Sequence, residues 1–118
     1  MPRLEGPALR HLTRGYRLTH VMNALALLNK HGLALRALGA RRLGIFGSVA
    51  RGEAGAASDV DVYVEFIPEA RTYDNFFALH ELLEELFARP VDLVTDGALT
   101  ESQARLILPT VQYAALDA

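Results

Sequence analysis

The stretch that decides the fold runs from Gly47 to Phe66 and reads GSVARGEAGAASDVDVYVEF. Its second half alternates between apolar and polar residues, which is the period of a β-strand with one buried face. The apolar residues of this strand share one face and are Val60, Val62, Val64 and Phe66. The polar residues share the other face and are Asp59, Asp61, Tyr63 and Glu65. We therefore expect a strand over Asp59–Phe66, with the core on one side and the chemistry on the other.

Gly47 and Ser48 follow directly on a short predicted strand, Arg42–Phe46. Glycine lets a backbone approach a ligand closely, and the start of a helical turn presents N–H groups that suit phosphate. We expect such a turn over Val49–Arg51. The Gly-Ser pair alone is weak support for a phosphate site, because many such pairs are only turns and the lysine of a P-loop is missing.

Asp59 and Asp61 are the stronger signal. Two aspartates at positions i and i+2 of a strand point the same way, and their charges repel unless a cation lies between them. Spacing alone leaves an acidic, solvent-exposed strand face as an equal alternative. If a metal does bind, carboxylate oxygens with no cysteine in the chain and no histidine nearby favour Mg²⁺ or Mn²⁺ over zinc.

Asp92 adds a third carboxylate, on a predicted strand over Val91–Thr95. We place this strand beside Asp59–Phe66, with Asp92 on the same side as the other aspartates. Three carboxylates that converge from two strands on a phosphate-binding turn fit metal-assisted phosphoryl transfer. Asp92 would then either bind the metal or accept the proton of the acceptor hydroxyl. Its alternative role is that of a solvated residue on a strand.

Helices are expected on both sides of these strands in the chain. One is rich in Ala and Leu, covers His20–Leu38 and is weakened at Gly32. Another begins after Thr72 as its N-cap, and a last one begins after Thr100 and is kinked or ended at Pro109.

The 118 residues are enough for one domain, which we place at 18–118, preceded by a basic N-terminal arm at 1–17. Residues 1–42 hold eight Lys or Arg residues and one acid, Glu5, although the whole chain has a net charge of -2. This basic segment either is a solvated helix face or attracts a nucleic acid, a nucleotide or an acidic partner surface. The absence of cysteine and of a long apolar run predicts a soluble, cytoplasmic protein.

The motif Gly47-Ser48, then Asp59-x-Asp61, then Asp92 resembles the DNA polymerase beta-like nucleotidyltransferase superfamily. The fuller string quoted above, followed by RPVDLVT, resembles its minimal nucleotidyltransferase branch. This resemblance covers about Leu38–Ala115. It implies an α+β fold in which a small mixed β-sheet, similar to the polymerase beta palm, carries helices on one face.

The resemblance also implies residue roles. Gly47 and Ser48 would bind the triphosphate, and the three aspartates would hold Mg²⁺ and carry catalysis. Arg51 would either contact phosphate or pair with Glu53 or Asp59 to order the loop. Tyr63, on the face of the aspartates, would either stack on a base or pack across strands.

The minimal branch resembles antitoxins that neutralise HEPN-domain ribonuclease toxins by attaching AMP to a toxin tyrosine. The expected function is therefore a Mg²⁺-dependent protein adenylyltransferase that uses ATP and acts as an antitoxin. The expected partners are a HEPN-type toxin and ATP, without membrane or direct nucleic acid, in a homo-oligomer or a hetero-oligomer with the toxin. The alternatives are an antitoxin that acts by occlusion alone, and an antibiotic nucleotidyltransferase, which usually carries additional sequence for its acceptor.

Overall fold

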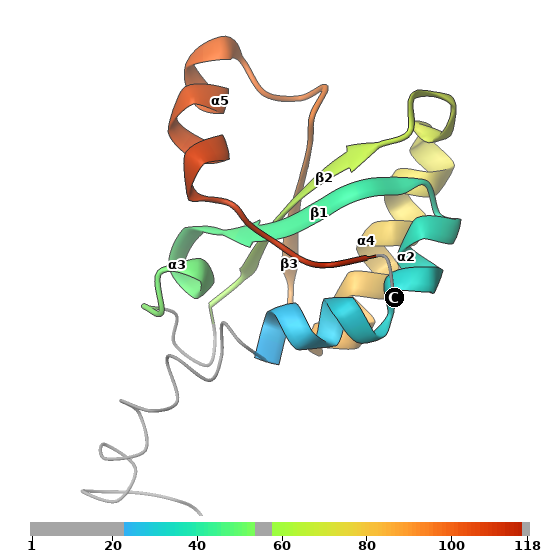
Figure 1. The fold of residues 1–118 in the computed structure, drawn as a ribbon, viewed down its shortest axis with the longest axis horizontal. Coiled ribbons are helices and arrows are strands. Elements are labelled where there is room, and N and C mark those ends of the chain that lie inside the picture. The colour runs from blue at the N-terminus through green and yellow to red at the C-terminus, as the bar shows by residue number, and fades with distance from the viewer. Residues whose placement is uncertain (1–22, 54–57, 117–118) are drawn as a thin grey trace, which may run out of the picture.

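The computed structural model describes residues 23–53 and 58–116 of the chain. At its centre lies a four-stranded mixed sheet with the strand order β3-β2-β1-β4 (Figure 1). The middle strands β1 (Ala40–Phe46) and β2 (Val60–Phe66) are antiparallel. β3 (Val91–Thr95) lies parallel to β2, and β4 (Gln112–Tyr113) lies antiparallel to β1. This mixed sheet with its helices confirms the predicted α+β class.

The core lies between the sheet and a helical layer made of residues 23–30, α2 (Gly32–Ala37) and α4 (Tyr73–Phe87). Its fully buried side chains are Leu28, Leu35, Leu43, Ile45, Leu79, Leu83, Val60, Val62 and Val64. α5 (Glu101–Ile107) has no buried residue and stands apart from this layer (Figure 1). Among the described residues, no helix has the length and apolar content to cross a bilayer.

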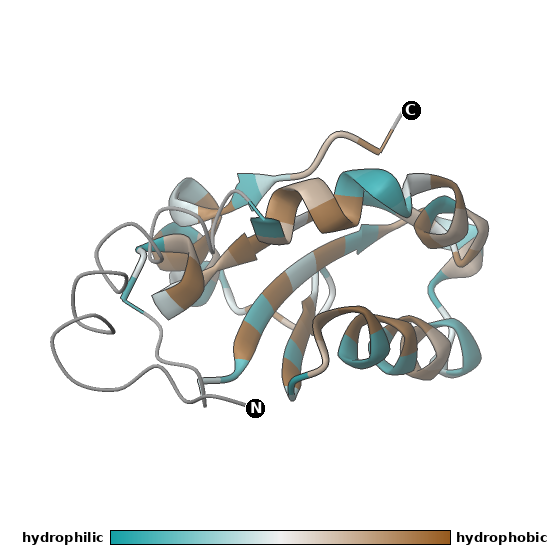
Figure 2. Cartoon of the chain, turned by 90° about the horizontal axis from the view of Figure 1, so that it is seen from below, coloured by the Kyte–Doolittle hydropathy of each residue, from teal (hydrophilic) through white to brown (hydrophobic). Residues whose placement is uncertain are grey.

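The alternation along β2 is confirmed, although the strand begins at Val60 and leaves Asp59 just before it. Figure 2 shows hydrophobic and hydrophilic residues following one another along the strands. The valines and Phe66 are buried in the core, while Asp61 and Glu65 are half-buried on the opposite face. Tyr63, between these two acids, is only 3% exposed, so this face is itself covered at the middle of the strand.

The predicted helix over His20–Leu38 is wrong in one respect, because the chain forms two helices that are separated at His31. His31 has φ -105° and ψ 22°, which is not a helical conformation. Gly32 then starts α2 in a buried position, where a Cβ would lie 3.0 Å from the carbonyl oxygen of Leu116. A side chain at position 32 would therefore crowd the C-terminal segment, which packs against the start of α2. Residues 20–22 lie outside the described part of the chain.

The predicted helix starts are confirmed by their caps. Thr72 caps α4, and its hydroxyl accepts a hydrogen bond from the N–H of Asn75 at 3.2 Å. Thr100 caps α5 in a capping box with Gln103, which satisfies two backbone donors reciprocally. α5 gives way to a 3₁₀ turn at Leu108–Thr110, as the proline there predicts.

β4 was not predicted, and its place depends on Gly44 in β1. Gly44 pairs with Tyr63 on one side and with Tyr113 on the other. A Cβ at Gly44 would lie 2.5 Å from the carbonyl oxygen of Gln112 and 2.7 Å from a methyl group of Val111. The absence of a side chain therefore lets the C-terminal segment close the edge of the sheet.

Gly44→Ala should lower the free energy of unfolding by about 1–3 kcal/mol, the usual cost of overpacking a close contact. Urea unfolding would measure the change. The matched control is Gly97→Ala, whose Cβ would meet the flexible end of Arg71 at 2.9 Å and should change stability little. Equal stability of the two variants would show that β4 does not require a glycine at position 44.

Candidate active site

The candidate site begins at a left-handed glycine between β1 and the short helix α3 (Gly47–Ala50). Phe46 is extended, and Gly47 then adopts a φ of 70°, a backbone conformation that costs other residues about 1–2 kcal/mol. A Cβ at Gly47 would overlap the carboxylate of Asp61. The backbone at the start of α3 therefore lies directly against an acidic side chain.

α3 turns the chain back within one helical turn. Arg51 N–H donates to the Gly47 carbonyl at 3.1 Å, and Glu53 N–H donates to the Ser48 carbonyl at 2.8 Å. The first N–H groups of any helix have no acceptor within that helix, so they face outward at this end. Ser48 is half-buried here, next to Gly47. The predicted turn over Val49–Arg51 thus exists, and it starts two residues earlier than expected.

Asp61 and Asp92 are direct neighbours on the parallel strands β2 and β3. Paired residues of two strands project on the same face of a sheet, so both carboxylates leave the face opposite the core. The predicted placement of Asp92 beside Asp61 is confirmed. Asp61 is half-buried, whereas Asp59 and Asp92 are exposed to solvent.

The pKa of the Asp61 carboxyl depends on these neighbours. Burial raises the pKa of the Asp61 carboxyl, and the charges of Asp92 and Asp59 raise it further. The guanidinium of Arg51 acts in the opposite direction and lowers this pKa. The site therefore brings Asp59 and Asp92 within electrostatic range of Asp61, which is the least exposed of the three.

The residues fit a hard divalent cation in their chemistry. Oxygen-only carboxylate donors suit Mg²⁺ or Mn²⁺, and a positive ion would relieve the repulsion that raises the pKa of Asp61. In the described ranges, however, no three acidic or histidine side chains are drawn together closely enough to enclose an ion. The aspartates converge on one region of the sheet without forming a closed ligand cage.

Arg51 takes up one of its two predicted roles. Its Nε donates to Glu53 Oε2 at 3.0 Å, in an ion pair whose two side chains are mostly exposed. This contact orders the loop after α3. An exposed ion pair contributes at most about 1 kcal/mol, so the pair is easily exchanged for another anion.

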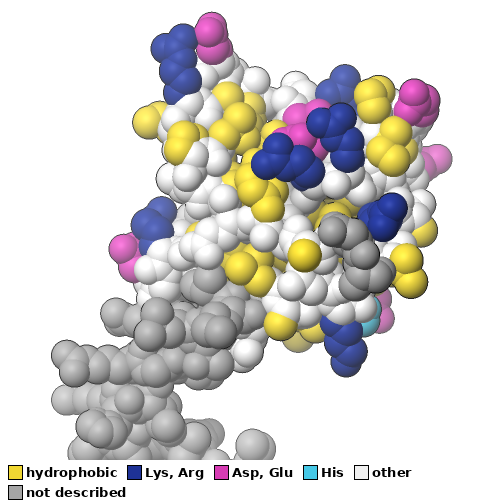
Figure 3. Space-filling view, in the orientation of Figure 1, with side chains coloured by type: hydrophobic (Ala, Val, Ile, Leu, Met, Phe, Trp, Pro, Cys, Tyr) yellow, Lys and Arg dark blue, Asp and Glu magenta, His cyan; other side chains and the backbone are white. Residues whose placement is uncertain are grey.

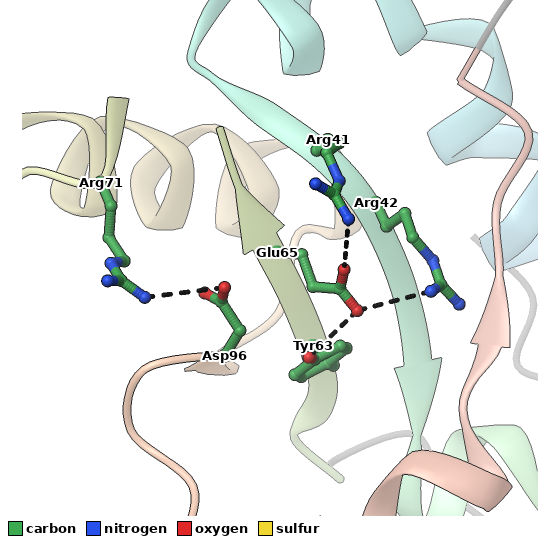
Figure 4. Close-up of polar contacts among 6 residues, drawn as sticks. All are labelled: Arg41, Arg42, Tyr63, Glu65, Arg71 and Asp96. Atoms are coloured by element: carbon green, nitrogen blue, oxygen red, sulfur yellow. Dashed lines mark hydrogen bonds and ion pairs between the residues drawn. The ribbon is translucent and has the colours of Figure 1, made fainter. Parts of the chain in front are cut away.

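A polar network on the same face of the sheet was missed by sequence reasoning (Figure 4). The Tyr63 hydroxyl donates to Glu65 at 3.2 Å, and Arg41 and Arg42 reach the same carboxylate at 3.8 and 3.6 Å. Arg42 also lies over the ring of Tyr113, 3.9 Å from its centroid. The alternation predicted that Tyr63 and Glu65 share a face, but their partners come from strands distant in sequence.

Tyr63 takes the packing role rather than an open stacking position. Its ring meets the ring of Tyr113 edge to face, with centroids 6.4 Å apart and planes at 73°. Burial and the neighbouring Glu65 carboxylate raise the pKa of the Tyr63 hydroxyl well above its ordinary value. Tyr63 is therefore a neutral, covered residue that supports the strand carrying Asp61.

Comparison with known proteins identifies the family to which this chain belongs. The model of the family described as "Nucleotidyltransferase domain" matches residues 29–114. The chain belongs to the nucleotidyltransferase domain family. This match lies within the domain predicted at 18–118, whereas the predicted arm at 1–17 lies outside both the match and the described residues.

Similarity to individual proteins supports this family assignment. The chain is 40% identical over 89 residues to the protein adenylyltransferase MntA of Thermococcus cleftensis, which covers 75% of this chain and 89% of that protein. It is 39% identical over 74 residues to a candidate protein adenylyltransferase of Methanocaldococcus jannaschii, over 62% of this chain and 85% of that one. The solved structure of a candidate minimal nucleotidyltransferase superposes with a TM-score of 0.62 at 35% identity, covering 75% of this chain and 93% of the other.

Replacement of Asp61 by asparagine should stabilise this nucleotidyltransferase at neutral pH when no divalent cation is present. The folded-state pKa of Asp61 is raised above 3.8, so its contribution favours folding below that pH and is lost as the pH rises through the folded value. The partly exposed position limits the gain at pH 7 to about 1 kcal/mol after solvent screening. Urea unfolding of both proteins at pH 7 and below pH 3.8 tests this, and an Asn variant that is less stable at pH 7 contradicts it.

Gly47→Ala should lower the free energy of unfolding by about 1–2 kcal/mol through its left-handed backbone. If Gly47 contacts the triphosphate, the variant should also weaken ATP binding by about tenfold or more, because the methyl group displaces the Asp61 carboxylate. Calorimetry with ATP measures the second effect. Gly52→Ala is the matched control, since Gly52 has a similar φ of 71°. Equal losses of ATP affinity in both variants would reduce the role of Gly47 to backbone strain.

Proposed function

We propose that this nucleotidyltransferase is a Mg²⁺-dependent protein adenylyltransferase that moves AMP from ATP to a tyrosine hydroxyl of a partner protein. The observation that carries the proposal is the apposition of the Gly47 backbone and the Asp61 carboxylate, with Asp92 beside Asp61 on the parallel strand. A turn that suits phosphate thus faces carboxylates that suit a cation. The names of the relatives, which are protein adenylyltransferases, support AMP as the group transferred.

In the proposed complex, the start of α3 at Gly47 and Ser48 binds the triphosphate through backbone N–H groups. Asp59, Asp61 and Asp92 would hold Mg²⁺, which when bound neutralises charge on the phosphates and orients them. Arg51 would exchange its exposed pair with Glu53 for a phosphate oxygen.

The transfer itself is a displacement at the α-phosphorus of ATP. The tyrosine oxygen forms the new P–O bond, the bond between the α-phosphorus and the bridging oxygen breaks, and pyrophosphate leaves. Asp92, which is exposed beside Asp61, would accept the hydroxyl proton or complete the cation site. Most of the rate acceleration in such a reaction comes from positioning of the reactants and from stabilisation of the charge in the transition state.

The exposure of the acidic face supports a protein as the acceptor. Asp59 and Asp92 are open to solvent, so a hydroxyl carried on the surface of another macromolecule can reach them. We propose a HEPN-domain ribonuclease toxin as this partner, which makes the protein an antitoxin. The proposal then locates the protein with its partner in the cytoplasm.

Incubation of the purified protein with a purified HEPN-domain ribonuclease, ATP and Mg²⁺ should add AMP to a tyrosine of that ribonuclease. Intact-mass spectrometry measures the product. Asp61→Asn combined with Asp92→Asn should slow the transfer by about 100-fold or more, the loss expected when charge-stabilising groups are removed. Glu69→Gln is the control, because it removes an exposed carboxylate beyond the other end of β2.

Three outcomes would overturn this function. Undiminished AMP transfer by the double Asn variant would mean that the aspartates are not the catalytic centre. Inhibition of the partner that is equally strong without nucleotide and with the double Asn variant would show neutralisation by occlusion. Transfer of nucleotide to an aminoglycoside and to no protein would replace the acceptor.

A further inference from the structure

α4 presents an acidic and aromatic surface away from the candidate active site. Tyr73 and Phe77, which are 82% and 60% exposed, stack with ring centroids 6.2 Å apart and planes at 19°. Asp74 and Glu81 are exposed within three or four residues of Phe77 and therefore adjoin it on the helix surface. We call Tyr73, Asp74, Phe77 and Glu81 the α4 stripe. Together the two exposed rings form a small apolar surface, and aromatic side chains are enriched at protein–protein interfaces.

The charge of this surface has a single sign along the helix. α4 contains four acidic residues and no Lys or Arg, so nothing on the helix itself neutralises the stripe. Arg71, just before the helix, is already paired with Asp96 at 3.6 Å (Figure 4). A partner for the α4 stripe should therefore combine apolar groups with positive charge.

A surface of that kind exists on the same chain. A groove of about 560 Å³ lies between α2, the start of β1 and Ile67, and it is lined by Leu33, Arg36 and Arg41 among others. Leu33 and Ile67 are 73% and 42% exposed. Two of the residues that line this groove, Arg36 and Arg41, are basic and none is acidic. Arg41 also reaches Glu65 at 3.8 Å, but its side chain is mostly exposed, and an exposed ion pair is weak enough to be exchanged for another anion. We call Leu33, Arg36, Arg41 and Ile67 the α2 groove.

α2 and the start of α4 both lie at the end of the molecule opposite α3 (Figure 1), and hydrophobic and basic side chains lie over α2 and the start of β1 at that end (Figure 3). Ile67 lines the α2 groove, and the adjacent Phe66 lines a second groove of about 580 Å³ with Tyr73 and Phe77. Adjacent complementary surfaces are what a two-fold symmetric pair requires, since each surface of one copy meets the other surface of its mate.

We propose that a second copy of this chain docks here, with the α4 stripe of each copy in the α2 groove of the other. Charge complementarity selects this occupant, because an acidic aromatic helix and a basic apolar groove are both present on one chain. Such a dimer leaves the Gly47 and Asp61 end free, so it is independent of the transfer reaction. In this dimer the basic residues Arg36 and Arg41 of one copy contact the acidic residues Asp74 and Glu81 of the other.

Sedimentation velocity of the full chain tests the dimer. The protein should dimerise in low salt. The affinity of the dimer should fall by about tenfold or more in about 1 M salt, where the Debye length falls to about 3 Å. Phe77→Ala should also weaken the dimer by about tenfold, because truncation of a central aromatic anchor typically costs that much. A parent protein that stays monomeric in low salt overturns the proposal.

Charge reversal gives the sharper test. Arg36→Glu with Arg41→Glu, and separately Asp74→Arg with Glu81→Arg, should each be monomeric, whereas an equimolar mixture of the two variants should form a heterodimer. The mixture restores both contacts, so misfolding cannot produce this result. Arg105→Glu on the exposed helix α5 is the control and should dimerise like the parent. Dimers of either reversed variant alone, or no heterodimer in the mixture, contradict the proposed interface.

Discussion

The candidate site depends on the close approach of the Gly47 backbone to the Asp61 carboxylate, at the point where β1 ends and β2 begins. Phe46 pairs with Asp61 across these strands, and the next residue, Gly47, turns with a φ of 70°. Because Gly47 has no Cβ, the start of α3 can lie against the Asp61 carboxylate. This one left-handed glycine therefore sets the distance between the turn proposed to bind phosphate and the acidic face.

The mixed sheet adds the second requirement, which is charge. Antiparallel pairing with β1 brings Gly47 to Asp61, and parallel pairing with β3 brings Asp92 to its other side. The half-buried Asp61 bears the repulsion of its neighbours, and its pKa is raised as a result. Functional sites often keep groups that oppose folding, because the same groups bind a ligand that relieves them. Here that ligand would be a divalent cation with its nucleotide.

Local patterns made the central part of the fold predictable. Strict alternation is enough to place Asp61 on a strand face, and Thr72 caps its helix through a contact three residues away. The unpredicted features depend on segments distant in sequence. Gly44 matters only because the C-terminal segment approaches it closely as β4. The helix is interrupted at His31, where α2 begins and packs against the same C-terminal segment. The same reason explains why the partners of Glu65 were not foreseen.

The most direct measurement of the site is the broadening of backbone amide signals by Mn²⁺ bound with a non-hydrolysable ATP analogue. If Gly47 and Asp61 form one nucleotide and cation site, the amides of Gly47, Ser48, Asp61 and Asp92 broaden first, and that of Tyr73 does not. The same titration of the Asp61→Asn variant should lose this selective broadening. Broadening centred elsewhere in the chain, or unchanged in the variant, would contradict a site built on the apposition of Gly47 and Asp61.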